Sequence, residues 1–144
     1  MGAISNLLDS KGYDVLTVKP TQLVRDAIEK MAEVSAGTSI VMDGGKVVGI
    51  ISERDVFRKV ILKGRSIDDI KVEDIMSTEL TTITPETSLD DCMKMMTEKR
   101  IRHLPVLRDK SLYGIVSIGD VVKYLVVEKD FKIKNLETYI SGAM

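Results

Sequence analysis

The sequence contains one cysteine, three prolines and no tryptophan among its 144 residues. With Cys92 alone, no disulfide can form within the chain, which is typical of a reducing compartment. No apolar run approaches the roughly 20 residues that a membrane-spanning helix needs. The first residues, MGAISNLL, lack the basic and apolar regions of a signal peptide. We therefore expect a cytoplasmic protein that does not engage a membrane.

Charge of one sign is also lacking, because 21 basic residues face 22 acidic residues and the net charge is −1. Such a chain has no long-range field to attract nucleic acid, and we expect no nucleic-acid partner. The composition, 44% hydrophobic and 30% charged, is that of an ordinary folded domain. The length predicts one compact unit, or two small units that share a core.

The sequence does contain an internal repeat. VVGIISERDV at residues 47–56 returns as LYGIVSIGDV at residues 112–121, and the same offset of 65 aligns Thr17 with Thr82. Further identical pairs follow along both copies without a gap, which chance does not explain.

Each copy predicts the order β-α-β-β-α. A short β-like run precedes a proline, apolar residues then recur at helical spacing, as in residues 24–31, and two β-like runs follow around a turn. A second helix begins near Asp55 in copy one and near Asp120 in copy two. We predict an α/β fold of the α+β type, in which two such repeats pack as a pseudo-twofold pair around a shared core.

The chain divides into five predicted parts. They are an N-terminal segment (1–14) with a short helix stopped by Gly12, repeat 1 (15–61), a connector (62–79), repeat 2 (80–126) and a C-terminal tail (127–144) that is a candidate helix.

The repeat unit resembles a CBS domain, and residues 12–126 are similar to a tandem CBS pair, or Bateman module. The motifs that carry the resemblance are VKPTQLVRDAIEKM, GKVVGIISERDV, VEDIMS, RIRHLPV and YGIVSIGDV. The resemblance implies a regulatory protein without catalysis that binds AMP, ADP, ATP, NAD(H) or S-adenosylmethionine in clefts between the repeats. It further implies a homodimer that senses energy or redox state and signals to a partner protein.

Ser-x-x-Asp occurs at the start of the second helix in both copies, as Ser52 to Asp55 and as Ser117 to Asp120. This spacing is that of a capping box, which satisfies free backbone N–H groups and needs no ligand. A helix start can also hold phosphate, and an aspartate there can accept ribose hydroxyls. The resemblance implies that the aspartate is the ribose ligand, and the two interpretations are compatible.

Further candidate ligand residues follow from the resemblance. Arg54 suits phosphate oxygens, although a solvated surface arginine is an equal alternative. Arg102 and His103 match the basic residues that meet the phosphates in the family, whereas copy one has Gly37 and Thr38 there. We take Thr38 as a binding residue too, and we expect the two clefts to differ.

Thr17 and Thr82 are expected near the ribose or the base, with strand propensity as the equal alternative. The single histidine has no second histidine or cysteine near it, and we expect no metal site. An enzyme is disfavoured because the sequence has no Walker loop and no nucleophile elbow. A dimerising scaffold that binds no ligand and regulates a partner protein remains the main alternative.

Overall fold

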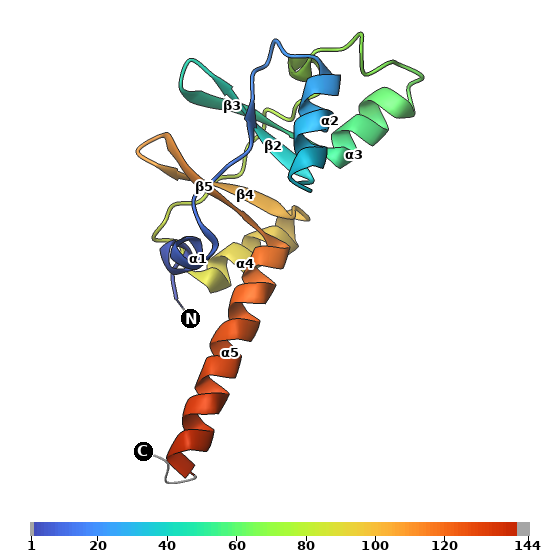
Figure 1. The fold of residues 1–144 in the computed structure, drawn as a ribbon. Coiled ribbons are helices and arrows are strands. Elements are labelled where there is room, and N and C mark those ends of the chain that lie inside the picture. Colours follow the sequence, from blue (N-terminus) through green and yellow to red (C-terminus); the bar gives the residue numbers. More distant parts are fainter. Residues whose placement is uncertain (1, 141–144) are drawn as a thin grey trace.

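The computed structural model describes residues 2–140, which fold into two small sheets flanked by helices (Figure 1). The C-terminal helix extends away from the rest of the molecule. In chain order the elements are α1 (Ile4–Lys11), β1 (Thr17–Val18), α2 (Val24–Glu33), β2 (Thr38–Asp43), β3 (Lys46–Ser52), α3 (Glu53–Val56), the π-helical turn η1 (Phe57–Ile61), the 3₁₀ turn η2 (Val72–Asp74), α4 (Leu89–Lys99), β4 (His103–Arg108), β5 (Ser111–Ser117) and α5 (Ile118–Ile140). Of the predicted tail, residues 141–144 lie outside the described residues.

Repeat 1 forms a three-stranded sheet in the order β1-β2-β3, with β1 parallel to β2 and β2 antiparallel to β3. Gly44 and Gly45 make the hairpin turn with φ of 58° and 81°, values that glycine adopts without strain. Helix α2 buries Val24, Ala27 and Met31, one face of the helix, as their spacing predicts.

Repeat 2 has the same layout. Strands β4 and β5 pair in antiparallel fashion, and a parallel bridge from Ile83 to Val106 stands where β1 pairs with β2 in repeat 1. The two hairpins even share a register irregularity, after Val41 and after Val106. The predicted fold class and the pairing of two β-α-β-β-α repeats are therefore confirmed.

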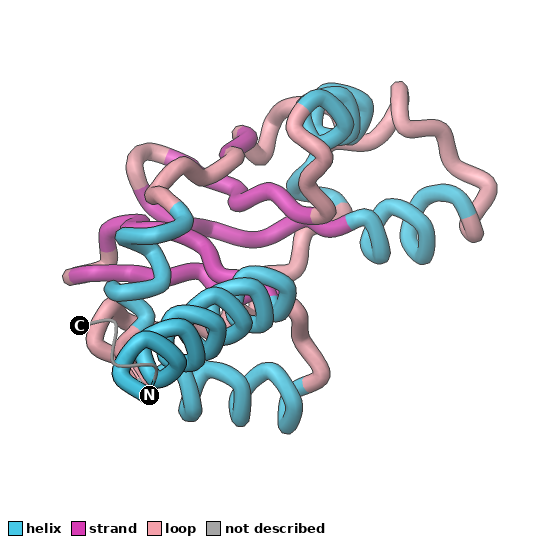
Figure 2. The backbone as a smooth tube through the Cα atoms, turned by 60° about the horizontal axis from the view of Figure 1, so that its bottom comes forward, coloured by secondary structure: helices cyan, strands magenta, loops and turns pink. Residues whose placement is uncertain are grey.

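The two sheets lie together in the middle of the molecule, with the helices of each repeat on the outside (Figure 2). Strand β3 contacts β5 across the boundary between the repeats. This arrangement places the ends of β3 and β5, and the helix starts that follow them, next to the opposite repeat.

The hydrophobic core of the described residues is divided in two, so the expected single shared core is wrong. One cluster joins α1 to repeat 2, and its members include Ile4, Leu7, Leu8, Leu89, Leu104 and Val116. The other joins repeat 1 to the connector, and its members include Val24, Val41, Ile51, Ile70, Val72 and Ile75. Each repeat thus completes its core with a segment from outside itself.

The segments that complete the two cores sit in matching places. Ala3 makes a backbone bridge to Ser88 at the start of α4, and Lys71 makes the same kind of bridge to Leu23 at the start of α2. Helix α1 precedes repeat 1 in the chain but packs on repeat 2, so the chain crosses from one repeat to the other between α1 and β1.

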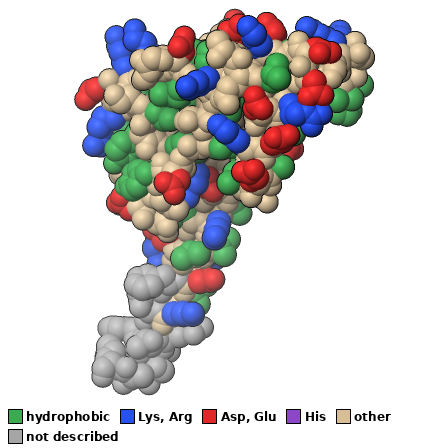
Figure 3. Space-filling model, turned by 45° about the horizontal axis from the view of Figure 1, so that its top comes forward, with side chains coloured by type: hydrophobic (Ala, Val, Ile, Leu, Met, Phe, Trp, Pro, Cys, Tyr) green, Lys and Arg blue, Asp and Glu red, His purple; other side chains and the backbone are tan. Residues whose placement is uncertain are grey.

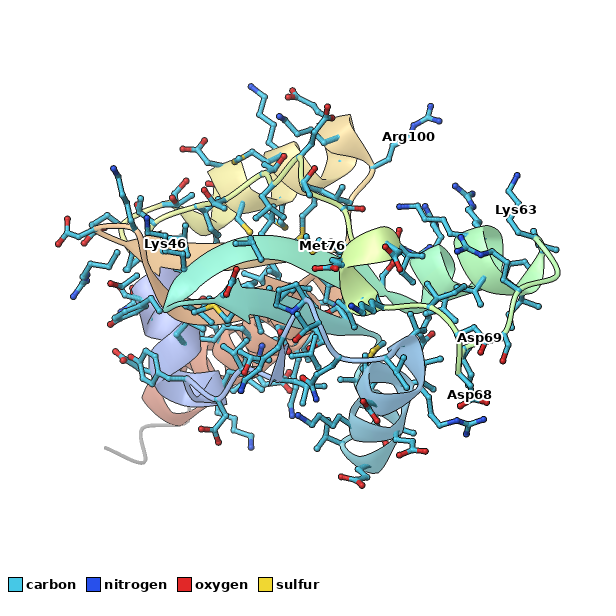
Figure 4. All side chains as sticks on the ribbon, turned by 90° about the horizontal axis from the view of Figure 1, so that it is seen from above. Lys46, Lys63, Asp68, Asp69, Met76 and Arg100 are labelled. Carbon is cyan, nitrogen blue, oxygen red and sulfur yellow. The ribbon has the colours of Figure 1, made fainter. Side chains whose placement is uncertain are left out.

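Two glycines, 65 residues apart, allow these segments to approach the sheets. A Cβ atom on Gly114 would lie 3.1 Å from the methyl carbons of Leu8, and one on Gly49 would lie 2.7 Å from the sulfur of Met76. Figure 4 shows Met76 beside the strands of repeat 1. Leu8 and Met76 are therefore spatial counterparts.

Replacing Leu8 with alanine should lower the free energy of unfolding by about 2–5 kcal/mol, because Leu8 is 0% exposed and the change leaves a cavity between α1 and repeat 2. Urea denaturation measures the loss. Leu136→Ala is the matched control, since Leu136 is 60% exposed and its truncation should cost less than about 0.5 kcal/mol. Equal effects of the two substitutions would contradict the packing of α1.

Candidate functional site

Two cavities lie between the repeats. One, of about 610 Å³, is lined by Asp120 and is here called the Asp120 cleft. The other, of about 380 Å³, is lined by Asp55 and is here called the Asp55 cleft. Both volumes are in the range of small-molecule sites. Each cleft is walled by both repeats, as expected for a ligand that bridges them.

The two Ser-x-x-Asp motifs form the predicted capping boxes. Ser52 Oγ accepts a hydrogen bond from the Asp55 N–H at 3.2 Å, and Asp55 Oδ2 accepts one from the Ser52 N–H at 3.0 Å. The corresponding distances between Ser117 and Asp120 are 3.0 Å and 2.9 Å. All four residues also line the clefts. The aspartates therefore cap their helices and face a cavity at the same time.

The two aspartates differ in their paired cation. Asp55 Oδ1 lies 3.2 Å from the ammonium of Lys59, one turn further along the same helix. The residue in that position after Asp120 is Tyr124, which carries no cation. Asp120 Oδ2 instead lies 2.7 Å from the ammonium of Lys11, at the end of α1. No sequence pattern predicts this contact, because Lys11 lies far from Asp120 along the chain.

The Asp120 carboxyl is held in its ionised form. Burial opposes ionisation, but hydrogen bonds from Lys11 and Ser117, together with the charge of Lys11, outweigh it and keep the pKa of Asp120 below its ordinary value. Asp120 is therefore available as a hydrogen-bond acceptor at neutral pH.

Guanidinium groups gather at the Asp55 cleft, which is lined by Arg54, Arg100 and Arg102. Arg100 was not among the candidates from sequence, although only Ile101 separates it from the basic residues Arg102 and His103. It ends α4 in a left-handed conformation, with φ of 53°, and points outward in Figure 4. Neither Arg54 nor Arg102 lines the Asp120 cleft.

The predicted threonines fall into two groups. Thr38 lines both clefts and is only 8% exposed. Thr17 and Thr82 line neither cleft, and their preceding residues Leu16 and Thr81 do. The difference is one residue of register, because successive side chains in extended chain point to opposite sides.

His103 stands at the same place in β4 as Thr38 in β2, and it too lines both clefts. Burial lowers its pKa below the ordinary 6.5, and the charges of Lys11 and Arg102 lower it further, whereas Asp120 opposes the shift. Within residues 2–140, no group of three His, Cys, Asp or Glu residues is placed to hold a metal ion.

Two further features bear on function. Cys92 is fully buried, and burial raises the pKa of its thiol to about 11, as expected for a packed side chain rather than a reactive one.

Across the described part of the chain, no helix combines the length and the apolar character that crossing a membrane requires. On the face shown in Figure 3, acidic and basic side chains are interspersed.

The ring of His103 should titrate below pH 6.5 in the unliganded protein, because burial and two cations favour its neutral form. Since the unfolded chain takes up this proton first as the pH falls, stability should decrease as the pH drops from about 6.5 towards the folded-state pKa. NMR observes the titration directly, because the chain has one histidine. In His103→Gln this part of the pH dependence should disappear, whereas a midpoint at or above 6.5 would contradict the burial of the ring.

Comparisons with known proteins agree with this geometry. The CBS domain family matches the chain twice, over residues 9–62 and 72–127. The mitochondrial CBS domain-containing protein CBSX3 of Arabidopsis thaliana is 42% identical over 148 residues, which cover 96% of this chain and 72% of that protein. The cytoplasmic location therefore stays a prediction.

Two solved structures are similar in fold. The CBS domain protein NE2398 has a TM-score of 0.83 at 39% identity, covering 86% of this chain and 97% of its own. The CBS domain pair of MJ0100 has a TM-score of 0.78 at 20% identity, covering 89% and 98%. With two family matches, the repeated fold and a 42% identical relative, the chain belongs to the CBS domain family as a tandem CBS pair.

Proposed function

We propose that this protein is a regulatory module without catalytic activity of its own, which binds adenosine-containing ligands in the clefts between its two CBS domains. The observation that carries the proposal is that Asp55 and Asp120 each line a cavity walled by both repeats. A carboxylate in such a place can accept hydrogen bonds from the two ribose hydroxyls. The structure of the MJ0100 pair contains 5′-methylthioadenosine and S-adenosylmethionine, which both carry that ribose.

The Asp55 cleft suits a ligand with phosphate groups, such as AMP, ADP, ATP or NAD(H). Arg54, Arg100 and Arg102 line it, and guanidinium groups bind phosphate oxygens in a fixed fork geometry. Ser52 and Thr38 supply hydroxyls in the same cavity. We assign the ribose to Asp55 and the phosphates to the arginines.

The Asp120 cleft has fewer cations than the Asp55 cleft and suits an adenosine ligand with fewer phosphate groups. Its lining includes Ser117 and His103, but a single lysine and no arginine. We assign the ribose to Asp120 in this cleft. For the segment that precedes the first strand, Leu16 and Thr81 take the positions expected for Thr17 and Thr82.

Titration of the ligand-stripped protein with AMP, ATP, NAD⁺, NADH and S-adenosylmethionine in a calorimeter tests the proposal. Asp55→Ala should weaken nucleotide binding by about 1–3 kcal/mol, because the ribose loses a charged acceptor. Ser88→Ala is the matched control, since Ser88 caps α4 by accepting from the Asp91 N–H at 3.0 Å but lines neither cleft. It should cost about 1 kcal/mol of stability and leave affinity unchanged.

The result that would overturn the proposal is equally direct. No heat and no thermal shift with any of the five ligands would favour the scaffold that binds none. If Asp55→Ala lowers stability like Ser88→Ala and leaves the affinity unchanged, the aspartate is a cap alone.

A second copy of the chain is the proposed partner in a homodimer. The second helical segments of the two repeats expose apolar side chains at equivalent positions, 65 residues apart. The pairs are Phe57 with Val122, Ile61 with Val126, and Leu62 with Val127, all more than half exposed. A repeated apolar surface of this kind is typical of an interface. The structurally similar CBS-CP12 protein from bloom-forming cyanobacteria is hexameric, so at least one similar protein forms an oligomer.

Introducing negative charge on this surface tests the homodimer. Ile61→Glu combined with Val126→Glu should convert a dimer to a monomer in light scattering, because a buried unpaired carboxylate is costly. Lys46→Glu, in the β2–β3 hairpin away from α3, is the control and should leave the mass unchanged. A monomeric wild-type protein at micromolar concentration would contradict the assignment.

In the assembled protein, ligands would act by shifting the balance between two relative orientations of the repeats or subunits. The shift cannot exceed the difference in affinity of the ligand for the two states. A regulated partner protein would then bind one orientation better than the other.

A further inference from the structure

The segments that lead into the two repeats differ in length. Leu8 and Met76 cover equivalent glycines, and Ala3 and Lys71 make equivalent backbone bridges. Both of these pairs are 68 positions apart, whereas the repeats themselves are 65 apart. The segment ahead of repeat 1 is therefore three residues longer.

The three extra residues lie between the middle of α1 and β1. After them, Asp14 and Glu79 are again 65 apart and line their respective clefts. The insertion thus falls between Leu8 and Asp14, where five residues (9–13) stand against two (77–78) before repeat 2. Lys11 lies within this longer stretch, and Gly12 ends the helix with φ of 107° and an N–H bonded to the Leu8 carbonyl at 2.7 Å.

This insertion delivers a cation into the Asp120 cleft. The backbone of α1 is fixed by the burial of Ile4, Leu7 and Leu8 in the core of repeat 2. From there the Lys11 ammonium reaches Asp120 Oδ2 at 2.7 Å and donates to the carbonyl of Ile115 at 2.5 Å. Both charged side chains are more than two-thirds buried, at 29% and 25% exposed, so the pair is shielded from solvent.

The cation on Asp55 is placed differently. Lys59 pairs with Asp55 from one turn further along the chain, but Lys59 does not line the cavity, whereas Lys11 does. A ligand that reaches Asp55 therefore meets no lysine in the cavity. A ligand that reaches Asp120 meets the Lys11 ammonium in the same cavity.

We propose that Lys11 is a specificity-determining residue that sets the charge preference of the Asp120 cleft. A neutral nucleoside must share the Asp120 carboxylate with the Lys11 ammonium. A cationic ligand such as S-adenosylmethionine is in addition repelled by it, and a ligand with phosphate is attracted. The only other titratable groups that line this cleft are Asp14 and His103, so Lys11 is its one permanent cation among the described residues.

The inference rests on the proposed binding of adenosine ligands, and the test reduces the contribution of the other cleft. Asp55→Ala, which weakens binding in the Asp55 cleft, serves as the background, so that a change caused at Lys11 reports the Asp120 cleft. Lys11→Met keeps most of the side-chain volume and removes the charge. Calorimetry then measures the affinities of adenosine, AMP and S-adenosylmethionine with and without this substitution.

In that background Lys11→Met should raise the affinity for adenosine about two- to fivefold, the amount expected when a partly exposed ion pair no longer competes. The affinity for S-adenosylmethionine should rise by more, and the ratio of AMP affinity to adenosine affinity should fall. Lys123→Met is the control for net charge. Lys123 lies one turn beyond Asp120 on α5 but lines neither cleft, and its removal should leave the ratio unchanged.

The possible failures are distinguishable. If the wild-type chain binds none of the probes, the proposed function is wrong. If the wild-type chain binds but the ratio does not change in Lys11→Met, or falls as much in Lys123→Met, the role of Lys11 is wrong. Absence of binding in the Asp55→Ala background overturns the inference if Lys11→Met does not restore it, and supports the inference if it does.

Discussion

The burial of α1 against repeat 2 is the contact on which the rest of the structure depends. Because α1 precedes repeat 1 but completes the core of repeat 2, residues 12–16 must cross from one repeat to the other. Residues 77–81 cross in the opposite sense, from the connector on repeat 1 into repeat 2. Residues from both crossings line the clefts. The same packing that fixes the repeats against one another therefore builds the walls between which a ligand would lie, and weakening it would alter stability and cleft geometry together.

The helix starts show how a structural device can also be a functional one. In each capping box the aspartate has two carboxylate oxygens, and the cap requires only one of them. Asp55 gives its other oxygen to Lys59, whereas Asp120 uses the same oxygen for the Ser117 N–H and for Lys11. A ribose could therefore bind without destroying the cap, and it would meet a different ion pair in each cleft. Partly exposed ion pairs contribute only about 0–1 kcal/mol, which a ribose hydrogen-bonded to a carboxylate can offset.

Sequence periodicity was sufficient for the repeated fold, because each β-α-β-β-α unit is specified by local patterns. The hairpin of repeat 2 forms without glycine in its turn, since Asp109 and Lys110 adopt the positive φ that Gly44 and Gly45 adopt in repeat 1. The contact between Lys11 and Asp120 could not be predicted from the sequence, because it depends on which repeat α1 packs against. Leu16 rather than Thr17 lines the cleft, and β1 spans only two residues, too few for alternation to predict which side chain faces the cleft. The division into two cores was not predicted for the same reason. Local sequence patterns do not indicate on which repeat the connector and α1 pack.

The asymmetry between the repeats is concentrated where the clefts meet. Thr38 and His103 occupy equivalent positions, and each lines both cavities, so neither cleft is isolated from the other. His103 already responds to Asp120 and Lys11 on one side and to Arg102 and Glu53 on the other. A phosphate bound among the arginines would favour the protonated ring, and a protonated ring would change the field that a ligand meets at Asp120. Any such coupling must act equally in both directions, because the free energy that links two binding events belongs to the pair. Two copies of one motif thus form two clefts that differ in charge and share a titratable residue, His103.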